Sequence, residues 1–148
     1  MNTRIVSATK RAIDFNADGA TGTFYAALRE RRFRGTRCTS CGHVPFPPRD
    51  HCVRCAQPAD GLALTHGMEW IDLPTLGMLY AFSQQQRSWR FSKPDVIGLV
   101  SLVGVSGLVL TKLDAPIESL AIGQDVEVDY LEIGPDLVVH QFRPCVGR

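Results

Sequence analysis

Four cysteines in two close pairs are the residues of this sequence best suited to chemistry. Both pairs have the spacing C-x2-C, and ten residues separate the two pairs. A C-x2-C turn brings two thiolates to one side, so two such turns can place four sulfurs at the corners of a tetrahedron. This donor set predicts a structural Zn²⁺ site with no open coordination position, formed by Cys38, Cys41, Cys52 and Cys55.

Other interpretations of these cysteines stay open at this point. Iron in a rubredoxin-like site accepts the same four thiolates. A site of three cysteines and one histidine could use His51. Disulfides are the third alternative, but the N-terminus has no apolar signal-peptide stretch and no apolar run is long enough to span a membrane. We therefore expect a reducing, cytoplasmic location, in which paired thiols bind metal.

The sequence predicts no catalytic residue. It contains none of the patterns G-x-S-x-G, H-E-x-x-H or a phosphate-binding glycine loop. The fifth cysteine, Cys145, lies three residues from the C-terminus and is expected to be an ordinary terminal residue. His140 lies in the last predicted strand, where we expect a half-buried, hydrogen-bonded side chain.

Charge is distributed unevenly along the chain. Residues 1–57 contain ten Lys or Arg against four Asp or Glu, whereas residues 58–148 contain six against eleven. This asymmetry suggests that the first part meets an anion or an acidic surface, although ordinary surface charge explains it equally well. Five arginines lie on or after the predicted helix, namely Arg29, Arg31, Arg32, Arg34 and Arg37.

A second basic group is interleaved with aromatic residues between the first two strands of the predicted barrel. Such a loop can stack on an adenine ring and pair with phosphates, or it can anchor a protein partner. Its members are Arg87, Trp89, Arg90, Phe91 and Lys93.

The spacing of apolar residues predicts the helix and strands that position these residues. A short helix is expected within 23–35, with Thr21 or Thr23 as its cap and Gly35 as its end. The cysteine turns follow, with Gly42 at a position that favours a positive φ. One short strand is expected around residues 68–73, and Ser106-Gly107 is expected to form a tight hairpin turn.

The second half of the chain reads as all-β. Five strands are predicted at about 77–86, 96–103, 108–113, 125–133 and 137–142, with one helical turn in the connection before the fourth. This pattern predicts a mostly β protein with an OB-like five-stranded barrel, and a small β-sandwich is the alternative. The expected units are a lead-in and helix at 1–35, a zinc ribbon at 36–76 and a barrel at 77–148.

Read in this order, the chain resembles a known family, the zinc-ribbon plus OB-fold proteins of domain of unknown function 35. The resemblance runs from about Phe24 to Pro144 and is carried by FYAALRERRF, RCTSCGHVPFPPRDHCVRC, GMLYAFS, VIGLVSL, IGQDVEVDY and the final FRP. It implies a non-catalytic subunit that docks on a thiolase-superfamily enzyme and helps frame its acyl-CoA channel. The small subunit of a benzoylsuccinyl-CoA thiolase is one kind of member that would fit.

The resemblance also implies that the partner carries out thiolysis, condensation or aldol cleavage. A heterotetramer with two copies of each subunit is then expected. We assign Phe24, Leu28, Trp89 and Phe91 to the partner interface, and Arg87, Arg90, Lys93 and Trp89 to CoA. The alternatives are a module that binds single-stranded nucleic acid, which the acidic barrel half disfavours, and an independent acyl-CoA-binding protein.

Overall fold

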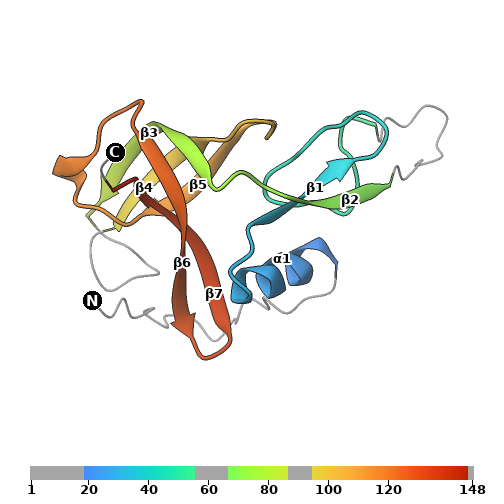
Figure 1. Cartoon of the computed structure of the whole chain (residues 1–148), viewed down its shortest axis with the longest axis horizontal. Helices are drawn as coiled ribbons and strands as arrows, with labels where there is room; N and C mark the ends of the chain where they lie inside the picture. Colours follow the sequence, from blue (N-terminus) through green and yellow to red (C-terminus); the bar gives the residue numbers. More distant parts are fainter. Residues whose placement is uncertain (1–18, 56–66, 87–94, 147–148) are drawn as a thin grey trace.

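A helix and a two-stranded ribbon come before a closed five-stranded barrel (Figure 1). The computed structural model describes residues 19–55, 67–86 and 95–146. Helix α1 (Ala20–Arg29) is followed by the ribbon strands β1 (Arg34–Cys38) and β2 (Met68–Asp72). The barrel contains β3 (Leu76–Gln85), β4 (Asp95–Ser101), β5 (Leu108–Leu113), the 3-10 turn η1 (Ile117–Ser119), β6 (Asp125–Gly134) and β7 (Leu137–Pro144).

The barrel has the strand order β3-β4-β5-β7-β6 and closes through pairing of β3 with β6. Strands β5 and β7 pair in parallel, and the other neighbours pair antiparallel. Large apolar side chains from the strands fill the interior, among them Leu79, Val100 and Phe142. The prediction of a mostly β protein with an OB-like barrel is confirmed, and η1 supplies the helical turn expected before the fourth barrel strand.

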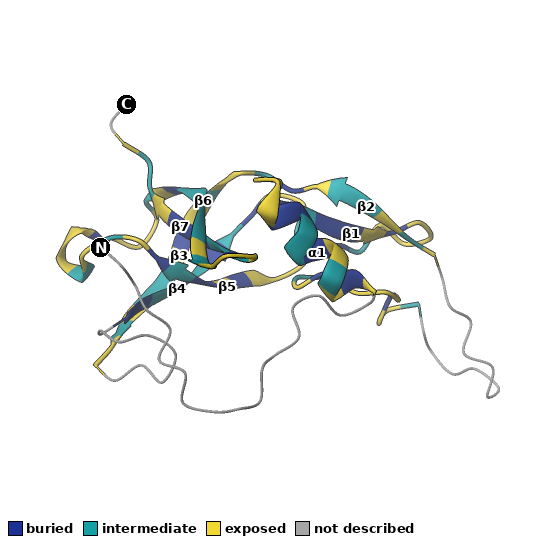
Figure 2. Ribbon diagram, turned by 90° about the horizontal axis from the view of Figure 1, so that it is seen from below, coloured by how far each residue is buried: buried dark blue, intermediate teal, exposed yellow. Residues whose placement is uncertain are grey.

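Helix α1 packs on β1 and β7 (Figure 2) and buries one apolar face. Phe24 and Leu28 are four residues apart and 4% and 0% exposed, respectively. The predicted threonine caps are wrong. Gly19 is the N-cap, and a carboxylate from outside the helix, that of Asp50, accepts a hydrogen bond from the Ala20 N–H at 2.8 Å. In the part of the chain that the structure describes, no helix is both long and apolar enough to cross a membrane.

The predicted end of the helix at Gly35 is also wrong. The helix ends at Arg29, and Arg31 adopts a φ of 58°, a left-handed conformation that stops the helical hydrogen bonds. Gly35 lies inside β1, opposite Ile71 of β2. A Cβ there would lie 2.8 Å from Leu73 Cδ2, so this glycine permits close packing of the chain on Leu73.

The connection between β4 and β5 differs from the predicted tight turn. It spans residues 102–107, with φ of 81° at Gly104 and 123° at Gly107. It is longer because Leu102 is buried in the core, while Ser106 bonds to the ribbon. The Ser106 N–H donates to the Val44 carbonyl at 2.8 Å, and the Val44 N–H donates to Ser106 Oγ at 3.3 Å.

Helix, ribbon and barrel meet in a cluster of four rings, which we call the aromatic junction. Phe24 comes from α1, Phe33 from the segment before β1, Phe46 from the loop between the cysteine pairs, and His140 from β7. The ring centroids of Phe24, Phe33 and Phe46 lie 5.9, 5.7 and 5.4 Å from that of His140. The hydrophobic core is therefore continuous from the ribbon into the barrel.

Candidate metal centre

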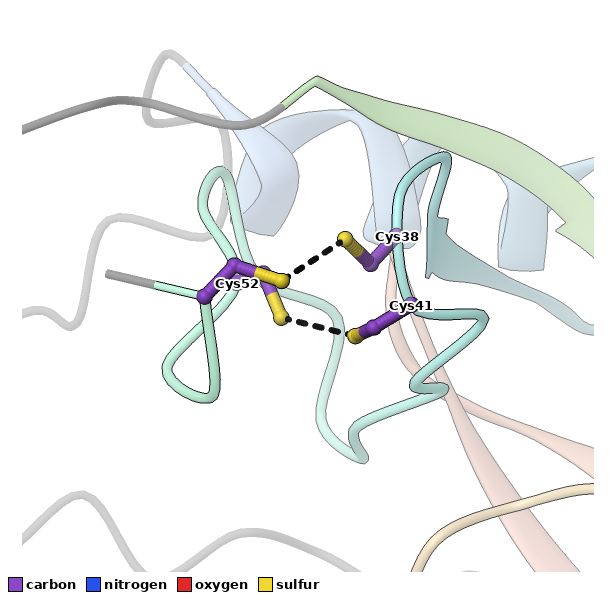
Figure 3. Close-up of side chains that lie close together, drawn as sticks. Cys38, Cys41 and Cys52 are labelled. Carbon is purple, nitrogen blue, oxygen red and sulfur yellow. Dashed lines mark hydrogen bonds between the residues drawn. The ribbon is translucent and has the colours of Figure 1, made fainter. Parts of the chain in front are cut away.

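The four predicted cysteines converge on one point of the ribbon. Their Sγ atoms all lie within 4.8 Å of one another. The Sγ atoms of Cys38 and Cys55 are 3.8 Å apart, and those of Cys41 and Cys52 are 3.6 Å apart (Figure 3). Two of the four cysteines are buried, so the sulfurs lie at the edge of the core.

These separations fit a tetrahedral metal ion. Zn–S bonds of about 2.3 Å place the sulfurs of an ideal tetrahedron about 3.8 Å apart. A disulfide would hold two sulfurs at about 2.05 Å, and none of the four cysteines of this centre forms one. The set that could hold a metal contains no histidine, so the alternative that uses His51, which is exposed, finds no support in the geometry. The four thiolates would hold zinc with every position filled.

Local backbone geometry positions the first pair. Cys38 is the last residue of β1, and its N–H donates to the His43 carbonyl at 2.9 Å. The Gly42 N–H donates to the Cys38 carbonyl at 2.9 Å, which closes the turn. Gly42 has a φ of 74°, as predicted, and nothing lies within 4 Å of where its Cβ would be. The backbone conformation, rather than lack of space, therefore favours glycine here.

The thiols themselves differ in acidity. Backbone N–H groups of Cys41 and Ser40 bond to the Cys38 sulfur and lower its pKa to about 6, against burial. The pKa of Cys55 is raised to about 12, chiefly because its thiol donates to Cys41, and further by burial. One thiolate is thus stabilised by the backbone before a metal arrives. A bound cation would stabilise the thiolate form of Cys55 as well, with release of its proton.

The loop between the two pairs, residues 42–51, connects the metal centre to the rest of the molecule; we call it the knuckle loop. Asp50 caps α1, and the Arg49 N–H donates to Thr36 Oγ1 of β1 at 3.0 Å. Phe46 enters the aromatic junction, and Val44 bonds to the β4–β5 connection. Fixing the four sulfurs therefore fixes a loop that touches the helix, the ribbon and the barrel.

His43 and His140 are the described histidines with buried, unpartnered ring nitrogens, Nδ1 and Nε2 respectively. Burial and nearby Arg54 lower the pKa of His43. Burial lowers the pKa of His140 to about 4, although its ring also donates to the Leu110 carbonyl. The half-buried, hydrogen-bonded strand histidine predicted at position 140 is confirmed. Its aromatic surroundings were not predicted, because the three phenylalanines are distant in sequence.

The arginines after the helix are engaged within the chain. Arg31 pairs with Glu132, Arg37 pairs with Glu69, and Arg32 and Arg34 both approach Asp72. The Arg34 guanidinium also lies 5.9 Å from the centroid of the Trp70 ring. Arg29 donates to the Asp136 carbonyl at 3.4 Å. The acidic second half of the sequence thus supplies the partners of the basic first half.

The residues assigned to a partner or to CoA fall into two groups. Phe24 and Leu28 are buried in this chain's own core, so they have no surface left for a partner, and their place in an interface is corrected here. The other predicted residues lie between 87 and 94, outside the described residues: Arg87, Trp89, Arg90, Phe91 and Lys93. Cys145 is half-buried, and its N–H donates to the Asp125 carbonyl at 3.2 Å.

Comparison with known proteins agrees with this geometry. Residues 26–59 match the model of the ChsH2 rubredoxin-like zinc ribbon domain. The chain is 26% identical over 129 residues to a protein of Thermomonospora curvata named a probable enoyl-CoA hydratase alpha subunit, covering 84% of this chain and 37% of that protein. The chain thus spans little more than a third of that relative's length. It is 28% identical over 119 residues to a DUF35 domain-containing scaffold protein of Methanocaldococcus jannaschii, covering 74% and 79% of the two chains.

Two solved structures share the fold. A chain of the Ltp2-ChsH2(DUF35) aldolase superposes with a TM-score of 0.67 at 24% identity, covering 92% of this chain and 98% of that one. A DUF35-family protein of unknown function from Sulfolobus solfataricus gives a TM-score of 0.58 at 15% identity, with 87% of each chain covered. The predicted resemblance to the zinc-ribbon plus OB-fold proteins of domain of unknown function 35 is confirmed.

Proposed function

We propose that this chain is a zinc-containing, non-catalytic subunit that docks on a thiolase-superfamily enzyme and helps frame its acyl-CoA channel. The observation that carries the proposal is the four-sulfur centre whose knuckle loop joins helix, ribbon and barrel. A centre with four protein ligands has no open position at which to activate water or substrate. Its contribution is the shape of the surface that the chain presents to another protein.

The names of similar proteins support an accessory role. One relative is named an alpha subunit, another a scaffold protein, and the fold recurs in a chain of an aldolase that combines Ltp2 with ChsH2. Two of these names, the alpha subunit and the aldolase, refer to parts of enzymes. The first of the two names an enzyme that acts on an acyl-CoA. We therefore place bond making or breaking in the partner, as thiolysis, condensation or aldol cleavage.

The finer parts of the proposal concern CoA and stoichiometry. Arg87, Arg90 and Lys93 have the charge to meet CoA phosphates, and Trp89 can stack on the adenine ring. Thiolase-type enzymes that are two-fold dimers would take two copies of this chain, which gives a heterotetramer. Both statements extend the resemblance to the family.

A nucleic-acid-binding role has less support. Four of the five arginines after the helix lie beside carboxylates of this chain. The β6 wall of the barrel carries Asp125, Glu127 and Asp129, whose charge repels phosphates. A groove that binds single strands needs positive charge and exposed stacking rings along the barrel.

The test is purification of the tagged chain from its own organism under mild conditions, followed by native mass spectrometry and metal analysis. We expect a stoichiometric complex with a thiolase-superfamily enzyme, equal numbers of the two chains, and about one zinc per copy of this chain. A tagged Cys38→Ser variant is the matched control for the role of the metal centre. Recovery of the wild-type chain as a zinc-loaded monomer without an enzyme partner would refute the proposal.

A further inference from the structure

The outer wall formed by β3, β4 and β5 is unusually apolar. Nine large hydrophobic side chains are exposed in the described residues, and five of them lie on the outside of β3 and β5. They are Leu76, Met78 and Tyr80 on β3, and Leu108 and Leu110 on β5. With Leu99 of β4, which is half-buried, they form what we call the apolar face.

Strand register brings these residues together. Residues directly opposite each other on neighbouring antiparallel strands point to the same side of the sheet. Met78 lies opposite Ser101, which in turn lies opposite Leu108. One row further along, Ala81 lies opposite Leu99, which lies opposite Leu110. The inward positions between them, such as Val100 and Val109, are completely buried, so the face is the outside of a filled barrel.

The exposed fractions are large for a protein that works alone. Leu110, Leu76 and Tyr80 are 64%, 55% and 54% exposed, and Met78 and Leu108 are 44% and 37% exposed. Together these side chains offer roughly 500 Å² of apolar surface, near the upper end of the largest patches on monomeric proteins. A standard interface buries about 800 Å² per partner, rather more than half of it apolar. The apolar face therefore matches the apolar part of one side of such an interface.

Charge is separated from this face. The β6–β7 wall carries Glu127 and Asp129, both within 4.0 Å of Arg143. On the outward positions of β3, β4 and β5, the charged residues are Lys112 and Asp95, which lie together at the far end of the face, 3.9 Å apart. At the opposite border, Met78 pairs with Asp125 of β6. The face thus has an uncharged centre and an acidic edge.

We propose that the apolar face is the surface that docks on the partner enzyme subunit. This inference rests on the proposed function and specifies which surface carries it out. The occupant is an uncharged apolar surface of that subunit, with basic residues opposite the acidic β6 edge. A charge placed against the centre would lose its hydration without gaining a partner, which disfavours binding. Along the edge, opposite charges would fix the orientation of the two proteins.

The test uses two charge substitutions at exposed positions of the face, Leu110→Glu and Tyr80→Glu. Val103→Glu is the matched control, because Val103 is 89% exposed and lies in the β4–β5 connection rather than in a strand. Each variant is purified with its zinc, and its affinity for the enzyme captured by the wild type is measured by isothermal titration calorimetry. Thermal unfolding and zinc content show that each variant is folded.

We expect Leu110→Glu and Tyr80→Glu to weaken enzyme binding about tenfold or more, with melting temperature and zinc content unchanged, while Val103→Glu binds like the wild type. Wild-type affinity in both face variants would overturn the inference and leave the proposed function standing. Failure of the wild type to capture any enzyme would overturn both. A wild-type homodimer that Leu110→Glu separates into monomers would assign the face to a second copy of this chain and likewise overturn the inference.

Discussion

The imidazole of His140 gives this fold a measurable sensitivity to acid. It lies among Phe24, Phe33 and Phe46, its Nε2 is buried without a partner, and burial lowers its pKa from 6.5 to about 4. The native state therefore excludes a proton that the unfolded chain accepts. We predict that replacing His140 with phenylalanine removes this penalty.

The magnitude follows from linkage between protonation and folding. Above pH 6.5 the imidazole is neutral in both states and contributes no pH dependence. As the pH falls from 6.5 towards 4, the unfolded chain binds the proton first, and the unfolding free energy decreases by about 1.4 kcal/mol per pH unit. The whole interval corresponds to about 3 kcal/mol. His140→Phe should thus gain about 3 kcal/mol relative to the wild type between pH 7 and pH 4.

The assay is urea unfolding followed by circular dichroism at several pH values between 7 and 4, at constant ionic strength. The quantity of interest is the difference between variant and wild type at each pH, since loss of metal from protonated thiols affects both proteins. His140→Asn is the second variant, because it cannot take up a proton but keeps an N–H near the position of Nδ1, the ring nitrogen left to donate to the Leu110 carbonyl. If the unfolding free energies of wild type and variants change in parallel from pH 7 to pH 4, the conclusion that native His140 resists protonation is refuted.

Three further predictions follow from single contacts. Cys38→Ser should lower the zinc content well below one ion per chain and weaken binding to the partner, as measured by metal analysis and calorimetry; full zinc and unchanged binding would contradict the role given to the centre. Asp50→Ala should cost about 1 kcal/mol of unfolding free energy, because it removes the acceptor at the α1 N-terminus, whereas Asp50→Asn keeps an oxygen there and should lose less in urea unfolding. Gly35→Ala should cost about 1–3 kcal/mol, since its Cβ would lie 2.8 Å from Leu73 Cδ2, and Leu73→Ala in the same background should recover part of the loss caused by the clash.

Local patterns in the sequence were sufficient for the metal ligands and for most of the barrel. The C-x2-C spacing determines which sulfurs can meet, and alternation such as Val126, Val128 and Tyr130 reports a strand directly. Both signals arise between residues that are close in sequence. The order in which the barrel strands pair was not predicted, because alternation does not specify which strands are neighbours.

The errors occurred where a distant residue determines local structure. Thr21 and Thr23 are good caps by type, but the Asp50 carboxylate, thirty positions from Ala20, occupies the helix N-terminus instead. Glycine is typical of helix ends, but Gly35 lies inside β1, where the Leu73 side chain leaves no room for a Cβ. Phe24 and Leu28 looked available to a partner because the β7 strand that covers α1 lies far along the chain.

The same long-range contacts explain how a metal that does no chemistry can govern assembly. The two cysteine pairs hold the ends of the knuckle loop, and this loop supplies the cap of α1 through Asp50 and one ring of the aromatic junction through Phe46. Its Val44 exchanges two hydrogen bonds with Ser106, in the connection that leads into β5 and its exposed Leu108 and Leu110. Without metal, only weak hydrogen bonds between sulfurs take the place of the metal–sulfur bonds, so the loop gains conformational freedom. The cap, the junction and the start of β5 would loosen together, which makes the order of the apolar face depend on the metal centre.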